Sequence, residues 1–183
     1  GVIPINRFGS WWTLLSASYL HGGVLHIFFN MIVLRQIGPL VIHEFGMNRF
    51  FIIYTVSGIA GFFLSYLAGV HFTIGASANL CGLIGAILYY GKARGGTFGT
   101  GLYRQVLTWL VVIAIIGFIL PGINNWAHGG GALAGIGLGY LLKYNERRPE
   151  NHHDRLLSLA CAVLTVVVLT WAVLRSMAIA FMN

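Results

Sequence analysis

The chain contains a succession of apolar segments, several of which reach or approach the length needed to cross a lipid bilayer. About 18 consecutive apolar residues are typical of a transmembrane helix. Only 8% of the residues are charged and 57% are hydrophobic, a composition that a soluble domain does not need. The sequence therefore predicts an all-α polytopic membrane protein. We expect six helices, over residues 19–41, 50–68, 77–90, 103–120, 123–144 and 155–182.

The charged residues lie mainly between these helices. The net charge is +7, but the eleven Lys and Arg residues are spread over several loops, so nucleic-acid binding is not expected. The segments 69–76 and 121–127 contain no Lys or Arg. By the positive-inside rule, the basic loops are cytoplasmic and these two segments lie on the opposite side. Eight basic residues fall on the cytoplasmic side: Arg49, Lys92, Arg94, Arg104, Lys143, Arg147, Arg148 and Arg155.

Three parts of the chain differ in character. Residues 1–18 include Trp11 and Trp12 and are expected to form an extracytoplasmic interfacial segment, because tryptophan is enriched at the headgroup level. Residues 19–144 form the predicted helical core, in which 91–101 is expected to be a polar, glycine-rich loop. Residues 145–183 are expected to comprise a charged cytoplasmic linker and one further transmembrane helix.

A stretch of small residues places Ser77 at the start of a predicted helix. Residues 77–90 are too few to cross a hydrocarbon core of ~30 Å, so Ser77 is expected to lie within the membrane beside protein or a water-filled cavity. Free N–H groups at a helix N-terminus stabilise negative charge. A serine that attacks a carbonyl needs such donors near the carbonyl oxygen, where negative charge develops. The alternative is a serine that only caps the helix.

His128 lies near the start of the predicted helix 123–144. Gly131, Gly135 and Gly139 fall on the face of His128, and small residues on such a face let another helix approach closely. The helix that begins at Ser77 carries a matching row at a spacing of four, formed by Ala78, Gly82 and Ala86. We expect the two rows to pack together and to bring the imidazole to the hydroxyl. The alternative is a hydrogen-bonded histidine with a structural role.

No acidic residue is available to complete a triad with Ser77 and His128. A serine hydrolase built on this chain would therefore use a dyad, with His128 as general base and then general acid. The acidic residues all lie in loops or at helix ends on the predicted cytoplasmic side: Glu44, Glu146, Glu150 and Asp154.

Three further polar residues lie near the start of the first predicted helix. His26 and Asn30 are spaced i, i+4 and share a helix face, and His21 precedes them. Imidazole and carboxamide N–H groups donate to an oxyanion, so the pair suits an oxyanion hole; the alternative is interhelical hydrogen bonding. A third possibility is a metal held by His21, His26 and His128. No carboxylate or suitable thiolate accompanies them, so we expect no metal and no cofactor.

Three motifs in this order resemble the rhomboid family of intramembrane serine proteases: Gly75-Ala-Ser77, His128-x-x-Gly131-x-x-x-Gly135 and His21-x4-His26-x3-Asn30. The resemblance implies a Ser77–His128 dyad, with His26, Asn30 and the Ser77 N–H around the oxyanion. His21, Gly75, Gly131 and Gly135 would support the site. The implied substrates are transmembrane helices with helix-destabilising residues, which enter laterally from the lipid bilayer and are cleaved near its extracytoplasmic side. The implied location is a bacterial plasma membrane.

The chain departs from the family pattern at several places. Ala78 replaces a glycine, Cys81 stands where an aromatic residue is common, and Thr13 follows Trp12 in place of arginine. The usual first core helix is missing, and we expect it upstream of Gly1. One alternative function is therefore a catalytically weak or inactive rhomboid-like protein that binds transmembrane helices. A small transporter or metal carrier is a further alternative and would predict inverted repeats.

Overall fold

The computed structural model describes residues 1–182 as helices joined by turns and loops, and no strand occurs in this range. The chain begins with the short helices α1 (Val2–Phe8) and α2 (Thr13–Ser16) and the 3-10 turn η1 (Ala17–Tyr19). The all-α fold predicted from the sequence is confirmed. The remaining helices have 18 residues or more: α3 (Val24–Phe45), α4 (Met47–Leu67), α5 (Ser77–Arg94), α6 (Gly96–Ile119), α7 (Asn125–Leu142) and α8 (His152–Met182).

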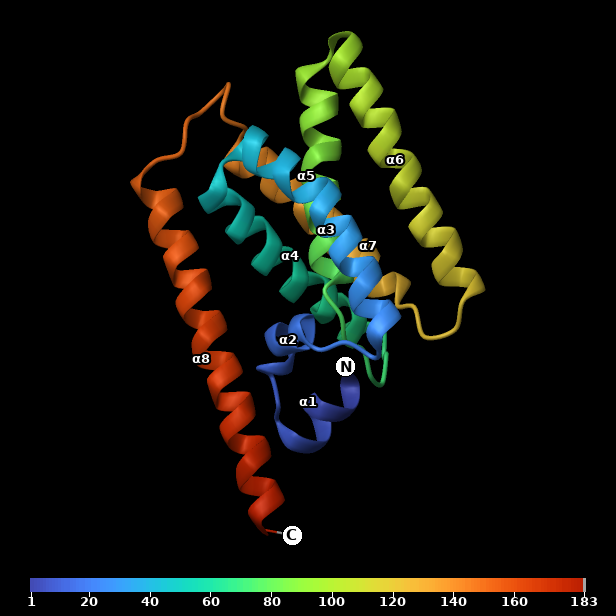
Figure 1. Ribbon diagram of the computed structural model, residues 1–183, viewed down its shortest axis with the longest axis vertical. Coiled ribbons are helices and arrows are strands. Elements are labelled where there is room, and N and C mark those ends of the chain that lie inside the picture. Colours follow the sequence, from blue (N-terminus) through green and yellow to red (C-terminus); the bar gives the residue numbers. More distant parts are fainter. Residues whose placement is uncertain (183) are drawn as a thin grey trace.

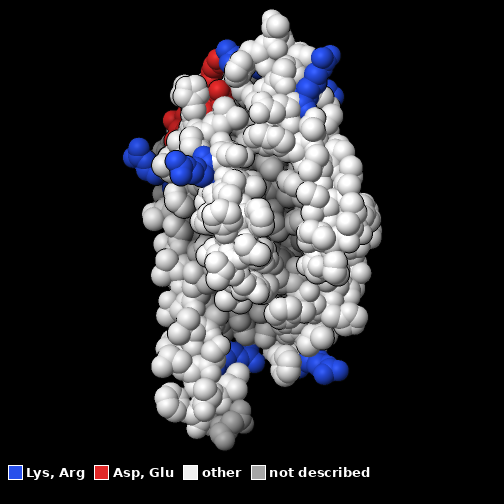
Figure 2. Space-filling model, turned by 45° about the vertical axis from the view of Figure 1, so that its right-hand side comes forward, with Lys and Arg blue, Asp and Glu red and all other residues white. Residues whose placement is uncertain are grey.

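Four of these helices, α3, α4, α6 and α8, are long and apolar enough to cross a membrane. Successive loops lie at alternate ends of the bundle, so that the α3–α4, α5–α6 and α7–α8 connections share one end (Figure 1). Lys and Arg side chains lie toward both ends of the molecule, and the visible Asp and Glu side chains lie toward one of them, with a broad uncharged band between the ends (Figure 2). This arrangement confirms a polytopic membrane protein.

Helix α5 forms the centre of the bundle. Thirteen of its 18 residues are buried, and it packs against α3, α4, α6 and α7. Helix α6 is mostly exposed: of its 24 residues, only Gly99 and Val106 are buried. The contrast shows that α5 is surrounded mostly by protein, and at 18 residues it is longer than the 77–90 helix that the sequence predicted.

The predicted loop over residues 91–101 is wrong. Helix α5 continues to Arg94 and α6 begins at Gly96, so the turn consists of Gly95 with a φ of +67°. A Cβ atom on Gly91 would lie 2.9 Å from the Gly99 carbonyl oxygen. These two glycines are therefore a close contact between α5 and α6 and do not mark a loop. The same glycines appear in sequence as loop-forming residues, which accounts for the error.

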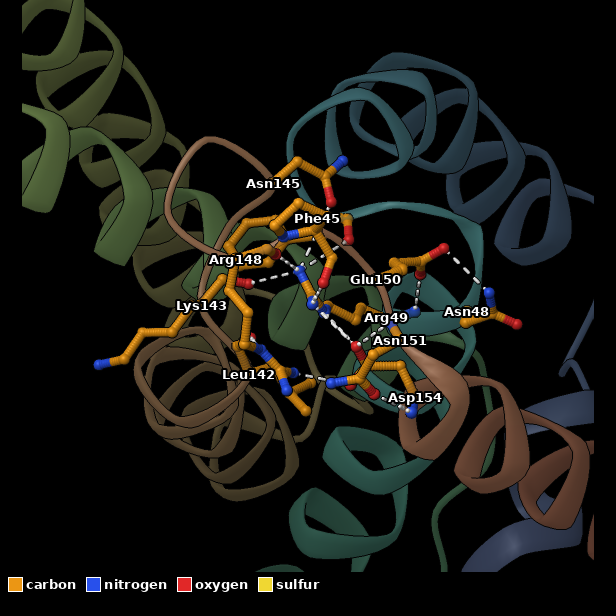
Figure 3. Close-up of polar contacts among 11 residues, drawn as sticks. Phe45, Asn48, Arg49, Leu142, Lys143, Asn145, Arg148, Glu150, Asn151 and Asp154 are labelled. Atoms are coloured by element: carbon orange, nitrogen blue, oxygen red, sulfur yellow. Dashed lines mark hydrogen bonds and ion pairs between the residues drawn. The ribbon is translucent and has the colours of Figure 1, made fainter.

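Arg49, which the sequence suggested as a loop cation, lies in the first turn of α4 and is completely buried. Its guanidinium donates to Asp154 Oδ2 from Nε at 3.1 Å and from Nη2 at 2.8 Å. It also donates to the carbonyl oxygens of Arg148 at 2.7 Å and Pro149 at 2.9 Å (Figure 3). Arg148 completes the cluster by donating to Asp154 Oδ1 at 2.8 Å. The cluster ties α4 to the linker before α8 and to the first turn of α8.

We predict that Asp154→Ala strongly destabilises the protein. The substitution leaves the Arg49 guanidinium buried without its carboxylate, and breaking a buried ion pair in this way costs about 3–5 kcal/mol. The expected result is a large fall in the midpoint of thermal unfolding of the detergent-solubilised protein.

Glu146→Ala is the matched control for this prediction. Glu146 pairs with Arg94 at 3.1 Å, but the two side chains are 53% and 38% exposed. Exposed pairs contribute about 0–1 kcal/mol, so this variant is expected to unfold close to the wild-type temperature. Equal shifts in the two variants would contradict the structural role of the buried cluster.

Candidate active site

The backbones of α5 and α7 touch along the two rows of small residues. A Cβ atom on Gly131 would fall on the Ala78 carbonyl oxygen, and one on Gly135 would fall on the Gly82 carbonyl oxygen. The rows therefore pack as the sequence predicts, with no side chain between the helices at these positions. This close approach fixes the register of α7 against α5.

In that register the side chains of Ser77 and His128 meet. His128 Nε2 lies 2.8 Å from Ser77 Oγ, a hydrogen-bond distance between residues 51 positions apart. Ser77 is the first residue of α5, but the N-cap residue is Ala76 and no side chain caps this end. The Ser77 hydroxyl is therefore bonded to the imidazole and does not cap its own helix.

The first turn of α5 also supplies free backbone donors. The first hydrogen bond within this helix runs from the Leu80 N–H to the Ala76 carbonyl oxygen at 3.0 Å. The N–H groups of Ser77, Ala78 and Asn79 precede it and have no acceptor in the helix. The positive end of the helix dipole lies at the same place, which favours a negative charge beside Ser77.

Gly75 shapes the turn that leads into Ser77. Its φ is +123°, a conformation that favours glycine. Its N–H donates to the Ala17 carbonyl oxygen at 2.9 Å, which ties the turn to η1. A Cβ atom at this position would lie 2.6 Å from Nε2 of His26. Gly75 is thus required both for the backbone conformation and for the position of the His26 ring.

His26 and Asn30 lie on α3 beside this turn. The Asn30 side chain is buried, and its Nδ2 donates to the His26 carbonyl oxygen at 2.9 Å. The Gly22 N–H donates to His26 Nδ1 at 3.4 Å, so the proton of a neutral His26 ring belongs on Nε2, the edge that faces Gly75.

His21 lies in the loop before α3, and its ring packs edge-on against the His26 ring with centroids 5.1 Å apart. Burial and the charge of neighbouring His26 both lower the pKa of His21. A lowered pKa keeps the His21 imidazole neutral at pH 7. Its Nε2 is buried without a hydrogen-bond partner among the described residues.

The Ser77–His128 pair lies in a cavity of about 640 Å³. His26, Asn30 and Cys81 share the cavity wall with the pair. The remaining wall is largely apolar and includes Phe29 and Val33 of α3 and Ile113, Ile116 and Leu120 of α6. The surface is hollowed along the uncharged band of the molecule (Figure 2). The cavity thus places a few polar groups among largely apolar walls.

Asn124 is a site residue that the sequence reasoning missed. It is the N-cap of α7, where its Oδ1 accepts from the Ala127 N–H at 3.1 Å. Its Nδ2 donates to Ser65 Oγ of α4 at 2.6 Å. Asn124 therefore fixes the start of α7, and with it His128, against α4. The signal was present, because asparagine is a favoured N-cap residue four positions before His128.

Asn79 contributes to packing rather than to the cavity. Its Nδ2 donates to the Tyr54 carbonyl oxygen at 3.0 Å, and its side chain is fully buried. A Cβ atom on Gly58 would fall on the Asn79 side chain. The two polar residues near the start of α5 thus differ in role, since Ser77 contacts a histidine and Asn79 joins α5 to α4.

His128 has no second partner among residues 1–182. Its Nδ1 is buried without a hydrogen bond, so no carboxylate orients the ring within that range. No group of three His, Cys, Asp or Glu side chains there could hold a metal ion, and the three-imidazole alternative is not formed. The arrangement offers a hydroxyl, an imidazole and nearby N–H donors, which suits nucleophilic attack on a carbonyl.

The Rhomboid domain family model matches residues 9–145. The chain belongs to the rhomboid family. This rhomboid is 39% identical over 140 residues to RHOMBOID-like protein 5 of Arabidopsis thaliana, an alignment that covers 73% of this chain and 45% of that protein. It is 35% identical over 132 residues to Rhomboid protease GluP of Bacillus subtilis, covering 70% of this chain and 25% of GluP.

A third relative is the rhomboid-family protein YdcA of Bacillus subtilis, which is 32% identical over 145 residues. That alignment covers 76% of this chain and 72% of YdcA. The chain spans less than half of the length of RHOMBOID-like protein 5 and of GluP. The relatives come from a plant and a bacterium, so they support a membrane location without selecting the bacterial plasma membrane.

We predict that Gly135→Ala disturbs the rhomboid site from a distance. The added methyl group meets the Gly82 carbonyl oxygen, and overpacking of this kind costs about 1–3 kcal/mol. The helices separate, and the Ser77–His128 contact weakens. The measurement is the midpoint of thermal unfolding, together with the rate at which a fluorophosphonate labels the protein.

Gly137→Ala is the control on the same helix. A Cβ atom at Gly137 meets no atom within 4 Å. Alanine in a helix interior is favoured over glycine by about 0.5–1 kcal/mol, so this variant is expected to be as stable as the wild type or slightly more stable. If both variants behave alike, the close contact of α5 and α7 does not control the site.

Proposed function

We propose that this rhomboid is an intramembrane serine endopeptidase that cleaves transmembrane-helix substrates with a Ser77–His128 dyad. The observation that carries the proposal is the 2.8 Å contact of His128 Nε2 with Ser77 Oγ inside a cavity with largely apolar walls. A nucleophile and a base within hydrogen-bond reach are the minimal requirement for such chemistry.

The reaction proceeds in two steps. His128 Nε2 takes the hydroxyl proton as Ser77 Oγ attacks the carbonyl carbon, and the carbonyl oxygen becomes an oxyanion. The tetrahedral intermediate then collapses, His128 gives its proton to the leaving amide nitrogen, and an acyl-enzyme remains on Ser77. In the second step His128 deprotonates a water molecule that attacks the ester. The second tetrahedral intermediate then collapses: His128 returns its proton to Ser77 Oγ as the ester C–O bond breaks, and the carboxylic acid product is released.

Two sets of donors would stabilise the oxyanion. The first is the free Ser77 N–H at the start of α5, supported by the helix dipole. The second is the Nε2–H of His26, whose tautomer is set by the Gly22 N–H, together with the Asn30 carboxamide on the same cavity wall. These donors are fixed before the substrate arrives, so they need no reorganisation as charge develops.

Substrates would reach the site from within the membrane. The cavity borders α3 and α6, and α6 is the least buried helix beside it. A substrate helix that enters between α3 and α6 has to unwind before its carbonyl can be attacked, because its backbone groups are already hydrogen-bonded. By the positive-inside rule the site lies toward the extracytoplasmic side, and a bacterial plasma membrane would suit this topology.

The alternative function is binding of transmembrane helices without cleavage. Cys81 lies on the cavity wall one turn after Ser77, and Ala78 occupies the position that follows the serine. The related proteins carry both kinds of name, since GluP is called a protease and RHOMBOID-like protein 5 is not. Both functions use the same cavity, and they differ in whether Ser77 is activated.

A cleavage assay in liposomes distinguishes the two functions. We expect the wild-type protein to cut a single-pass substrate helix that carries helix-destabilising residues, and we expect Ser77→Ala and His128→Ala to lower the rate by at least about 10²–10⁴-fold. Ser57→Ala is the control, because Ser57 is also a buried membrane serine but has no hydrogen-bond partner among the described residues. Its activity is expected to stay near that of the wild type.

Two outcomes would contradict the proposal. Retained cleavage in Ser77→Ala or His128→Ala would remove the dyad from the mechanism. Binding of the substrate helix by a folded wild-type protein that never cuts it would favour the helix-binding alternative.

A further inference from the structure

Helix α8 runs along one side of the bundle and contacts only α4 and α2 extensively, while most of its surface is exposed (Figure 1). The first turn of α8 is attached to α4 by the buried ion pair of Asp154 with Arg49. Arg175 lies 21 residues after Asp154, which is about 30 Å along a helix and therefore close to the other side of the membrane. There α8 makes a second attachment.

The second attachment is to Trp12. The Arg175 guanidinium carbon lies 4.5 Å from the centroid of the Trp12 ring. The Trp171 ring meets the same indole edge-on, with centroids 6.2 Å apart and an interplanar angle of 88°. Trp171 and Arg175 are spaced i, i+4 and so share one face of α8. Two side chains of α8 thus hold a single indole.

Trp12 stands at the start of α2. Its carbonyl oxygen accepts the N–H groups of Leu15 and Ser16, both at 3.0 Å, so α2 is built directly on this residue. Ala17 follows α2 and is buried against α4, α5 and α7 through Phe62, Ala78 and Ala127. A shift of Trp12 would therefore be transmitted through a short, hydrogen-bonded segment into the interior of the bundle.

Ala17 connects this segment to the site. Its carbonyl oxygen accepts the Gly75 N–H at 2.9 Å. Gly75 in turn lies against the His26 ring and precedes Ser77 by two residues. The path from α8 to the site thus consists of the Arg175–Trp12 contact, the α2–η1 segment and one backbone hydrogen bond.

We propose that Arg175 is a positioning residue that holds α2 and η1 in place and thereby the turn that carries Ser77. The arginine would otherwise extend toward the lipid headgroups, as long cationic side chains near helix ends do. Here the Arg175 guanidinium lies over the Trp12 indole, at the start of the segment whose Ala17 carbonyl oxygen accepts the Gly75 N–H. The consequence for proteolysis rests on the proposed function, whereas the anchoring of the turn does not.

Hydrogen exchange followed by mass spectrometry tests the anchoring in the full chain reconstituted in lipid. In Arg175→Ala we expect amides of residues 13–19 and 69–77 to exchange about two- to fivefold faster, the factor that corresponds to loss of a cation–π contact. Arg175→Lys retains a cation over the indole and is expected to keep much of the protection. Leu174→Ala is the control, because Leu174 is 58% exposed and lies beside Arg175.

Three results would overturn the anchoring: unchanged exchange in Arg175→Ala, an equal increase in Leu174→Ala, or equal loss of protection in the Lys and Ala variants. The first result would mean that Arg175 contacts the lipid headgroups and does not hold the α2–η1 segment in place. A cleavage assay on the same variants is expected to show a lower rate in Arg175→Ala with unchanged helix content. Faster exchange in Arg175→Ala, in a protein whose wild type does not cleave, would support the anchoring and refute the proposed function.

Discussion

The direct contact between the backbones of α5 and α7 is the constraint on which the rest of the structure depends. A Cβ atom on Gly131 or Gly135 would fall on the carbonyl oxygen of Ala78 or Gly82, so the two helices approach more closely than any other residue at these positions would permit. Inside a membrane no hydrophobic force drives helices together, and small residues at the contact supply close van der Waals packing instead. That packing fixes the position of α7 along the axis of α5, and this register places His128 beside Ser77.

The helices around this contact differ in what they face. Helix α5 is buried on nearly all sides, and its first turn carries free N–H groups beside Ser77. Helix α6 exposes most of its surface and borders the cavity with apolar side chains. The polar clusters lie toward the ends of the bundle, with Arg49 and Asp154 at one end and Asn124 at the other. Polar attachments at both ends of the bundle therefore hold the helices that form the site.

The sequence was sufficient for the features that follow from composition and local spacing. Apolar runs predicted the membrane helices, the small residues after Gly75 predicted a helix that begins at Ser77, and the four-residue spacing of glycines predicted the packed face of α7. It was insufficient where a residue type has two common roles. Gly91 and Gly99 suggested a loop but form a helix contact, and Arg49 suggested a cytoplasmic loop but binds partners about 100 positions away. Such distant partners leave no local pattern.

The most direct test of the central claim is to locate the adduct of a fluorophosphonate on the protein. The reagent phosphonylates a serine that an adjacent base activates, and peptide mapping by mass spectrometry identifies the modified residue. The account predicts one adduct per chain, on the peptide that contains Ser77, and none in His128→Ala. An adduct on another serine, or none on a folded wild-type protein, would contradict the claim that His128 activates Ser77.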